Sequence, residues 1–344
     1  MVFVVHSCEN YYIGPGHFGV SNQTDRWLIS VIDGICRISV PLFLMVSAYL
    51  LAPLKEGTNE KAFLWKRTKR IIIPLLLMEV VYIFLPLAWG GGSLQMSLKQ
   101  LWKLPLNFPM NAGHLWFVYA LFGLYLFLPI ISPWLRKATA KQELFFLAIW
   151  LIASAIPFLN HFWGDVWVDC GWNRFGMLYC FNGYLGYVVA GHYIKEHLDW
   201  SDSKRRLIGA SLFLVGATVA VLSFYAQAIP GEKMPRSLEI GWDFATLNIV
   251  LASLGAFLFL TTIHRRGKAY PLIVDISKAS YGMYLMHMLF LTAFSRLCVD
   301  NMPTIISIFT IAIATFTSTY IVTKLISFIP GGKWLVGYDG RRGR

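Results

Sequence analysis

Nine long runs of mostly apolar residues follow one another along this sequence and constrain its fold more than any other feature. A bilayer core about 30 Å thick is crossed by a helix of roughly 20 apolar residues, and each run approaches or exceeds that length. None shows the strict alternation of barrel strands. We predict an all-α, polytopic integral membrane bundle, with spans at Trp27 to Pro53, Ile71 to Trp89, Leu115 to Leu135, Leu144 to Trp163, Phe175 to Ile194, Leu207 to Ile229, Phe244 to Ile263, Ser280 to Leu297 and Thr304 to Ile329.

The basic residues indicate how these spans are oriented. If a short apolar stub at Met1 to Cys8 belongs to a first helix, alternating spans place 22 of the 30 Lys and Arg residues on one side. The positive-inside rule makes that side cytoplasmic, together with both ends of the chain. About ten transmembrane helices follow, and the net charge of +12 is explained without nucleic acid. The predicted inside segments are 54–70, 136–143, 195–206, 264–279 and 324–344.

The stub is shorter than a membrane helix. Eight helical residues extend only about 12 Å, less than half of the hydrocarbon core. We therefore expect the native chain to carry about ten to twenty further residues before Met1, enough to complete a span. The rest of the sequence predicts a single transmembrane domain over residues 1–329 and a short basic cytoplasmic tail over residues 330–344.

Ionisable side chains inside the spans are few, and each costs about 2.5–3.5 kcal/mol on insertion, so they are functional candidates by default. His6 has Glu9 one helical turn later, where a carboxylate can hold one imidazole nitrogen and leave the other to act as a base. A hydrogen-bonded core histidine is the alternative. The full set is His6, Asp33, Arg37, Glu79, His192 and His287.

For four of these residues, the sequence suggests which groups surround the side chain. Asp33 and Arg37 are four residues apart on one helical face, so they either neutralise each other or serve a substrate. Glu79 is expected to hydrogen-bond a neighbouring helix. His287 shares a face with Tyr284, which is compatible with a packed core histidine or with a site residue.

Arg67 and Arg70 lie in a basic cluster just inside the third helix. Three residues apart, they point the same way on a helix and can clamp phosphate oxygens, for which guanidinium groups are well suited. Coenzyme A would fit such a clamp. The alternative is that these arginines bind no ligand and are present because cytoplasmic segments are rich in Lys and Arg. The five cysteines show no paired spacing and indicate neither a metal site nor a disulfide framework.

Several local sequences resemble the acyltransferase-3 family of bacterial membrane proteins, in the order in which the family has them. These are His6 in the first helix, ISVPLFLMVSAYLL, the RxxR of Arg67 and Arg70, HLWFVYALFGLYLFLPI from His114 to Ile130, and ISKASYGMYLMH ending at His287. The chain is most similar to members without an added soluble domain, of the type that O-acetylates the enterobacterial common antigen. One departure is the arginine that family members carry eleven residues before the first-helix histidine, because only five residues precede His6.

The resemblance implies transfer of an acyl group, usually acetyl, from cytoplasmic acyl-CoA to a hydroxyl of an envelope glycan or lipid-linked saccharide in the bacterial inner membrane. It implies His6 as the catalytic histidine and Arg67 and Arg70 beside the donor phosphates, with no permanently bound cofactor. His6 acts either as the base for direct transfer or as an acyl carrier.

Five further residues are candidates for lining the acceptor pocket. His114 and Trp116 are placed to bind a sugar, since an indole stacks on a pyranose ring, although interfacial anchoring explains Trp116 equally well. The others are Arg37, Tyr284 and His287. A transporter or flippase of envelope precursors is the alternative function, because it would share this composition and topology.

Overall fold

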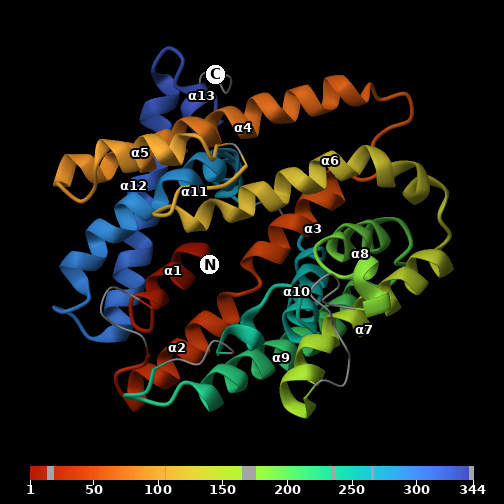
Figure 1. Ribbon diagram of the computed structural model, residues 1–344. Coiled ribbons are helices and arrows are strands. Elements are labelled where there is room, and N and C mark those ends of the chain that lie inside the picture. Colours follow the sequence, from red (N-terminus) through yellow and green to blue (C-terminus); the bar gives the residue numbers. More distant parts are fainter. Residues whose placement is uncertain (14–18, 105, 165–175, 234–237, 265–266, 341–344) are drawn as a thin grey trace. The chain divides into compact units, whose positions relative to one another are not determined.

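The computed structural model describes residues 1–13, 19–104, 106–164, 176–233, 238–264 and 267–340. Every regular element in these ranges is helical, as the apolar runs predict (Figure 1). The elements are α1 (Val2–Glu9), α2 (Gln23–Cys36), α3 (Ser39–Leu51), α4 (Glu60–Phe84), η1 (Leu85–Trp89), α5 (Leu94–Leu101), η2 (Gly113–Leu115), α6 (Trp116–Lys137), α7 (Ala140–Trp163), η3 (Gly176–Phe181), α8 (Leu185–Glu196), α9 (Asp202–Gln227), η4 (Leu238–Trp242), α10 (Leu247–Leu260), α11 (Tyr270–Cys298), α12 (Thr304–Phe328) and α13 (Lys333–Val336).

The helices form two compact units. The first unit comprises Met1–Lys55, Leu128–Arg265 and Pro303–Ile308. The second comprises Glu56–Phe127, Arg266–Met302 and Phe309–Arg344. The helices α6 and α12 each contribute residues to both units.

The core of the first unit is built around Trp242. Its ring stacks on Phe224 with the centroids 3.9 Å apart, and Tyr12 meets both rings edge-on. The indole nitrogen of Trp242 donates to the carbonyl of Ala220, 3.2 Å away, which satisfies the polar atom of this fully buried side chain. This cluster joins α1, α2, α9 and α10.

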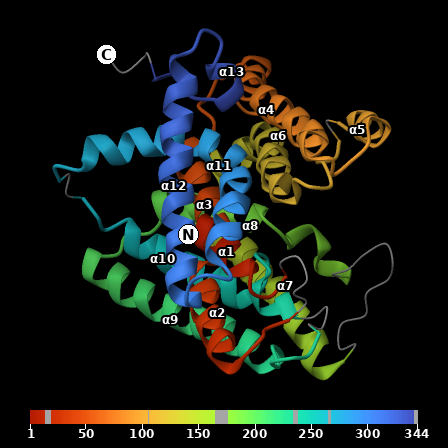
Figure 2. The ribbon, with the colours of Figure 1, turned by 90° about the vertical axis from the view of Figure 1, so that its left-hand side faces the viewer.

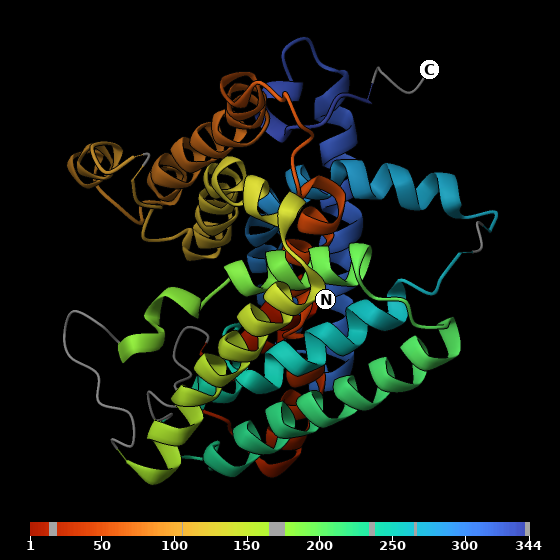
Figure 3. The ribbon, with the colours of Figure 1, turned by 90° about the vertical axis from the view of Figure 1, so that its right-hand side faces the viewer.

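The helices α9 and α10 run side by side (Figure 3) and approach closely at three glycines. A Cβ atom added to Gly209, Gly216 or Gly255 would lie less than 3.0 Å from backbone atoms of the other helix. Small residues at a helix contact allow backbones to pack closely, which is a common way to join helices in a bilayer. We call these three residues the glycine seam.

The predicted span from Trp27 to Pro53 consists of two helices, α2 and α3. The break at Arg37 and Ile38 has a local cause in Pro41, whose nitrogen cannot donate to the carbonyl four residues earlier, that of Arg37. The break places Arg37 at the C-cap of α2, next to the Trp242 cluster.

The second unit is organised by α4 and α11, with α5 and α13 packed on α4 (Figure 2). The hydroxyl of Tyr281 donates to the carbonyl of Ile71 (2.7 Å), and that of Tyr82 donates to the carbonyl of Leu285 (3.1 Å). Gly282 allows the backbone of Val336 to approach, since a Cβ there would lie 2.7 Å from its carbonyl oxygen. The chain around α13 is thereby held against α11.

Seven helical segments in the described ranges are long and apolar enough to cross a membrane, with α2 and α3 counted together as one segment. Exposed Leu207, Leu214 and Val215 on α9 are typical of the side chains that a bilayer covers. The predicted spans at Phe175 to Ile194 and Ser280 to Leu297 are not among the seven, and the count of ten remains a prediction.

The run from Phe175 to Ile194 is not one continuous helix, which corrects the prediction. Phe175 lies outside the described residues, η3 ends at Phe181, and α8 begins only at Leu185. Gly183, with φ of 88°, makes the turn between them, a conformation that favours glycine. The second missing span belongs to α11, which has 29 residues. This helix carries His287, three tyrosines and the charged residues Asp275, Lys278 and Arg296, and these lower its mean hydropathy.

Candidate functional site

His6 and Glu9 belong to the first unit, where both lie on α1 and meet as the spacing predicts. The Nδ1 atom of His6 is 2.6 Å from Oε2 of Glu9, and the two side chains are 18% and 23% exposed. The short helix is stabilised at its end by Asn10, whose amide donates to the carbonyl of Ser7 (3.0 Å). A carboxylate this close fixes the ring orientation and favours a proton on Nδ1, so that Nε2 is the basic nitrogen.

Arg37 is also in the first unit, inside a buried polar network. Its guanidinium donates to both carboxylate oxygens of Asp33 at 2.8 and 3.1 Å and to the hydroxyl of Tyr12 at 2.7 Å, and it lies 4.4 Å from the centre of the Trp242 ring. Tyr12 in turn donates to Asp33 (3.1 Å). The predicted ion pair between Asp33 and Arg37 is therefore present. Tyr12 and Trp242 also contact the guanidinium group.

Arg67 and Arg70 lie on α4 in the second unit, but they have different surroundings. Arg67 is half-buried, with its guanidinium 5.3 Å from the ring centres of both Phe63 and Tyr125. Its Nε atom is buried and has no hydrogen-bond partner within the described residues. Arg70 is exposed and lines a cavity of about 710 Å³. Arg67 is not among the described residues that line this cavity.

This cavity, which we call the basic cavity, is formed wholly by the second unit. Six cationic side chains and two acidic ones line it, so its net charge is strongly positive. Trp334 and Tyr338 add aromatic surface. The charged residues are Lys66, Lys69, Arg70, Lys278, Lys324, Lys333, Asp275 and Asp339. Such a lining suits a ligand that carries several phosphate charges.

Asp275 holds one wall of the basic cavity together. Its carboxylate accepts hydrogen bonds from the ammonium of Lys324 (2.6 Å) and from the hydroxyls of Tyr320 and Tyr338 (2.5 Å each). Burial raises the pKa of this carboxyl, but the hydrogen bonds from Lys324, Tyr320 and Tyr338 outweigh it and lower the pKa to about 2. Asp275 thereby joins α11, α12 and the segment after α13.

Gly337 brings that segment onto α4. It has a φ of 64°, and a Cβ atom at this position would lie 3.0 Å from the carbonyl oxygen of Arg70 and 2.7 Å from the ring of Tyr281. Glycine is required by both the conformation and the space. Asp275, Gly337 and Tyr338 are not among the residues predicted from the sequence, where the one signal is an isolated acid, Asp275, within a basic segment.

His114, Tyr284 and His287, which were predicted to line the acceptor pocket, come together in the second unit. The rings of His114 and His287 are 4.8 Å apart and nearly perpendicular, and both are buried. The Tyr284 hydroxyl donates to the carbonyl of His114, and Nδ1 of His287 faces the carbonyl of Tyr284 at 2.5 Å. Tyr82 completes the cluster, 5.2 Å from the His114 ring.

Trp116 and Glu79 lie in the same unit. Trp116 is half-buried and packs on Phe117 at 6.1 Å, and Phe117 reaches Tyr284 at 5.9 Å. Fully buried Glu79 accepts a 2.6 Å hydrogen bond from Tyr119 on α6, which confirms the predicted partner on a neighbouring helix.

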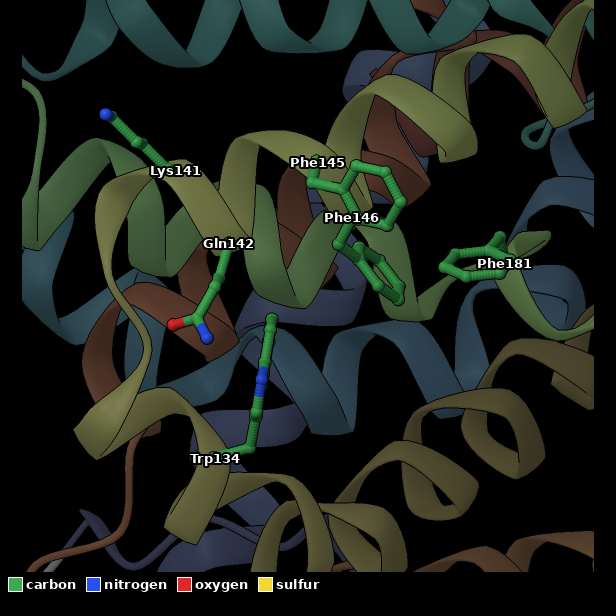
Figure 4. Close-up of a pocket in the computed structure, with 6 residues that line it drawn as sticks. All are labelled: Trp134, Lys141, Gln142, Phe145, Phe146 and Phe181. Atoms are coloured by element: carbon green, nitrogen blue, oxygen red, sulfur yellow. The ribbon is translucent and has the colours of Figure 1, made fainter.

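A further cavity of about 450 Å³ lies in the first unit and contains none of the predicted site residues (Figure 4). Its lining is mainly aromatic, with Trp134 and Phe181 each within 6.1 Å of the Phe146 ring. Lys141 points away from these rings in Figure 4. The aromatic rings offer apolar surface, and Lys141 is the one ionisable side chain among the described lining residues.

The helices define a multi-pass membrane protein, and the polar clusters distinguish it from a purely structural bundle. The sequence matches the acyltransferase-3 family, described as an acyltransferase domain, over residues 1–324. The chain therefore belongs to this family and is a membrane acyltransferase. The match does not favour the transporter alternative. No curated protein and no solved structure matches the chain.

Proposed function

We propose that this protein transfers an acetyl group from cytoplasmic acyl-CoA to a hydroxyl of an envelope glycan or a lipid-linked saccharide. The basic cavity is the observation that carries the donor assignment, because it gathers six cationic side chains around a space of about 710 Å³. We assign the bacterial inner membrane as its location, with both ends of the chain in the cytoplasm, as the distribution of Lys and Arg predicts.

Arg70 and its neighbouring lysines bind the donor phosphates in this proposal. Guanidinium and ammonium groups form short, charge-assisted hydrogen bonds with phosphate oxygens, and Trp334 offers an aromatic face for the adenine ring. Arg67, held over Phe63 and Tyr125, extends the positive charge along α4. The buried Nε–H of Arg67 is a hydrogen-bond donor that a ligand can satisfy.

His6 supplies the base. Its Nε2 atom takes the proton of the acceptor hydroxyl while that oxygen attacks the thioester carbonyl carbon, and Glu9 stabilises the imidazolium that results. The carbon–sulfur bond then breaks, and the departing thiolate takes the proton from His6, which yields the ester and free CoA. In the alternative route, His6 first accepts the acyl group and then passes it to the hydroxyl.

The acceptor pocket is assigned to His114, Trp116, Tyr284 and His287, with Arg37 as a further candidate. Clustered imidazole and phenol groups provide the hydrogen-bonding surface that a saccharide requires, and Trp116 provides an indole face. The contacts of Arg37 with Asp33 and Tyr12 favour a role in holding the first unit together.

Binding of acyl-CoA to the purified full chain tests the donor site. We expect Arg70→Ala to weaken acetyl-CoA binding by about tenfold or more, because it removes a charge-assisted contact with phosphate. Arg67→Ala should also weaken binding. Lys61→Ala is the matched control, since it removes an exposed positive charge from the same helix outside the basic cavity. Unchanged binding in both arginine variants would exclude the donor assignment.

Loss of acylation tests the catalytic assignment independently of donor binding. His6→Ala should lower acyl transfer by about 10²- to 10⁴-fold while acetyl-CoA binding persists, because only the base is removed. His264→Ala, which alters an exposed histidine of the same unit, is the control. Mass spectrometry of envelope glycans from cells carrying each variant measures the outcome, and an acylated glycan in the His6→Ala cells contradicts the proposal.

A further inference from the structure

Three potential metal ligands meet where α7 begins and α8 ends, within the first unit. Glu143 lies in the first turns of α7, His192 is on α8, and His197 is the C-cap of α8. Oε1 of Glu143 is 2.9 Å from Nδ1 of His192 and 3.2 Å from Nε2 of His197. The three ligand atoms all lie within 4.8 Å of one another, and no other such group occurs in the ranges that the structure describes.

These ionisable side chains are more deeply buried than is usual for side chains that only hydrogen-bond one another. Glu143 is fully buried, and the side chain of His192 is only 3% exposed. Both imidazoles face the same carboxylate oxygen, whereas Oε2 of Glu143 is buried without a hydrogen-bond partner in the described part of the chain. An unsatisfied oxygen of this kind costs free energy, and a cation that the carboxylate binds through both of its oxygens would satisfy it.

The ligand set selects the class of cation. Two imidazole nitrogens and one carboxylate are the ligands of zinc sites with an open fourth position, and also of some iron(II) sites. Mg²⁺ and Ca²⁺ prefer oxygen ligands throughout. In a tetrahedral zinc site with bonds of about 2.0–2.1 Å, ligand atoms are about 3.3 Å apart. The separations of 2.9 and 3.2 Å between the Glu143 oxygen and the two imidazole nitrogens are close to that value.

We propose that Glu143, His192 and His197 bind one divalent transition-metal ion of the zinc class, which ties the start of α7 to the end of α8. A water molecule would complete the coordination from the side of His197, which is 23% exposed. The cysteine spacing gave no indication of metal binding, because these ligands are not cysteines, and Glu143 lies 49 and 54 residues before the two histidines. The site is independent of the acyl-transfer proposal.

Metal content of the full-length protein, purified in detergent without a histidine tag, tests the proposal. After loading with Zn²⁺ and dialysis into metal-free buffer, elemental analysis should find about one zinc per wild-type chain. Glu143→Gln preserves the shape of the side chain but should reduce zinc affinity by about 100-fold, and His197→Ala should do the same. His264→Ala is the matched control, because it alters an exposed histidine beside Asp202 and should retain the full zinc content.

A second measurement on the wild type alone guards against variants that misfold. Chelation should lower the thermal unfolding temperature and Zn²⁺ should restore it, because an ion that binds only the folded state stabilises that state. Co²⁺ loading should give the visible absorption of a four-coordinate site. Wild-type protein that holds no zinc after dialysis, or that holds no more than the Glu143→Gln variant, would overturn the proposal.

Discussion

At the residue scale, the contact between His6 and Glu9 determines which nitrogen of the imidazole can act. The carboxylate lies 2.6 Å from Nδ1, so the ring is oriented by a hydrogen bond and not by packing alone. A base oriented in this way keeps its reactive nitrogen in one place, and the carboxylate compensates the positive charge that forms during proton transfer.

Glu9→Gln is expected to lower the rate constant for acyl transfer by about 10- to 100-fold with little change in the KM for acyl-CoA. The amide keeps the size of the side chain but loses the negative charge that stabilises the imidazolium. Steady-state kinetics of the purified variant measure both parameters. A wild-type rate constant, or a loss confined to KM, would show that Glu9 does not support the base.

The residue contacts that could be predicted are the ones that helical spacing fixes. His6 with Glu9 and Asp33 with Arg37 are one turn apart, so periodicity alone brings them together. Tyr119, by contrast, is 40 residues from Glu79. Which side chain of a neighbouring helix reaches a given position depends on helix packing, and packing leaves no local pattern in a sequence.

At the element scale, Asp275 connects two helices and the chain after α13 through three hydrogen bonds to one carboxylate. Tyr320 and Lys324 come from α12, while Tyr338 lies in the segment that Gly337 turns onto α4. The predicted basic tail of residues 330–344 therefore includes residues that pack in the second unit and line the basic cavity. Its basic composition alone did not indicate this contact.

Asp275→Asn should destabilise the second unit by about 1 to 2 kcal/mol at pH 7. The native pKa of about 2 is below the ordinary 3.8, so the ionised carboxylate contributes stability that is fully present above about pH 4 and is lost as the pH falls toward 2. Thermal unfolding of wild type and variant in detergent should show a constant difference from pH 8 to about pH 4 and a smaller one below.

Asp300→Asn is the control for that comparison, because it removes an exposed carboxylate that follows α11. It should leave the unfolding temperature unchanged across the same range. A difference between wild type and Asp275→Asn that already shrinks between pH 7 and pH 5 would contradict a carboxylate held by Lys324, Tyr320 and Tyr338.

Breaks inside the apolar runs could not be predicted from hydropathy. The run from Trp27 to Pro53 is long enough to be one helix, and hydropathy does not register that Pro41 divides it. The interruption before α8 depends on the turn at Gly183 in the same way. A hydropathy window averages over such single residues, whereas the backbone responds to each of them.

At the scale of the whole molecule, the fold class follows from the apolar runs because a bilayer admits few alternatives to helices. Seven of the described helical segments are suited to crossing it. The division into two units has no counterpart in the sequence, since each unit is assembled from three separate stretches of chain. Such assembly depends on contacts between distant residues, which a single sequence does not display.

The orientation in the membrane can be tested with single cysteines at two exposed positions, introduced into a chain whose five native cysteines are replaced by serine. Glu232→Cys lies in a segment predicted to be outside, so an impermeant maleimide should label it in intact cells. Lys268→Cys lies in a segment predicted to be inside and should be labelled only after permeabilisation. The reverse pattern would invert the predicted topology.

The glycine seam between α9 and α10 limits how this chain can evolve. Gly209, Gly216 and Gly255 each face backbone atoms of the other helix, so even one methyl group at these positions must push the two helices apart. The exposed leucines and valines on α9 can exchange with other apolar residues at little cost, because lipid adapts to their shapes. Neutral drift in α9 and α10 should therefore be broad on the lipid-facing surface and nearly absent at three positions that have no side chain at all.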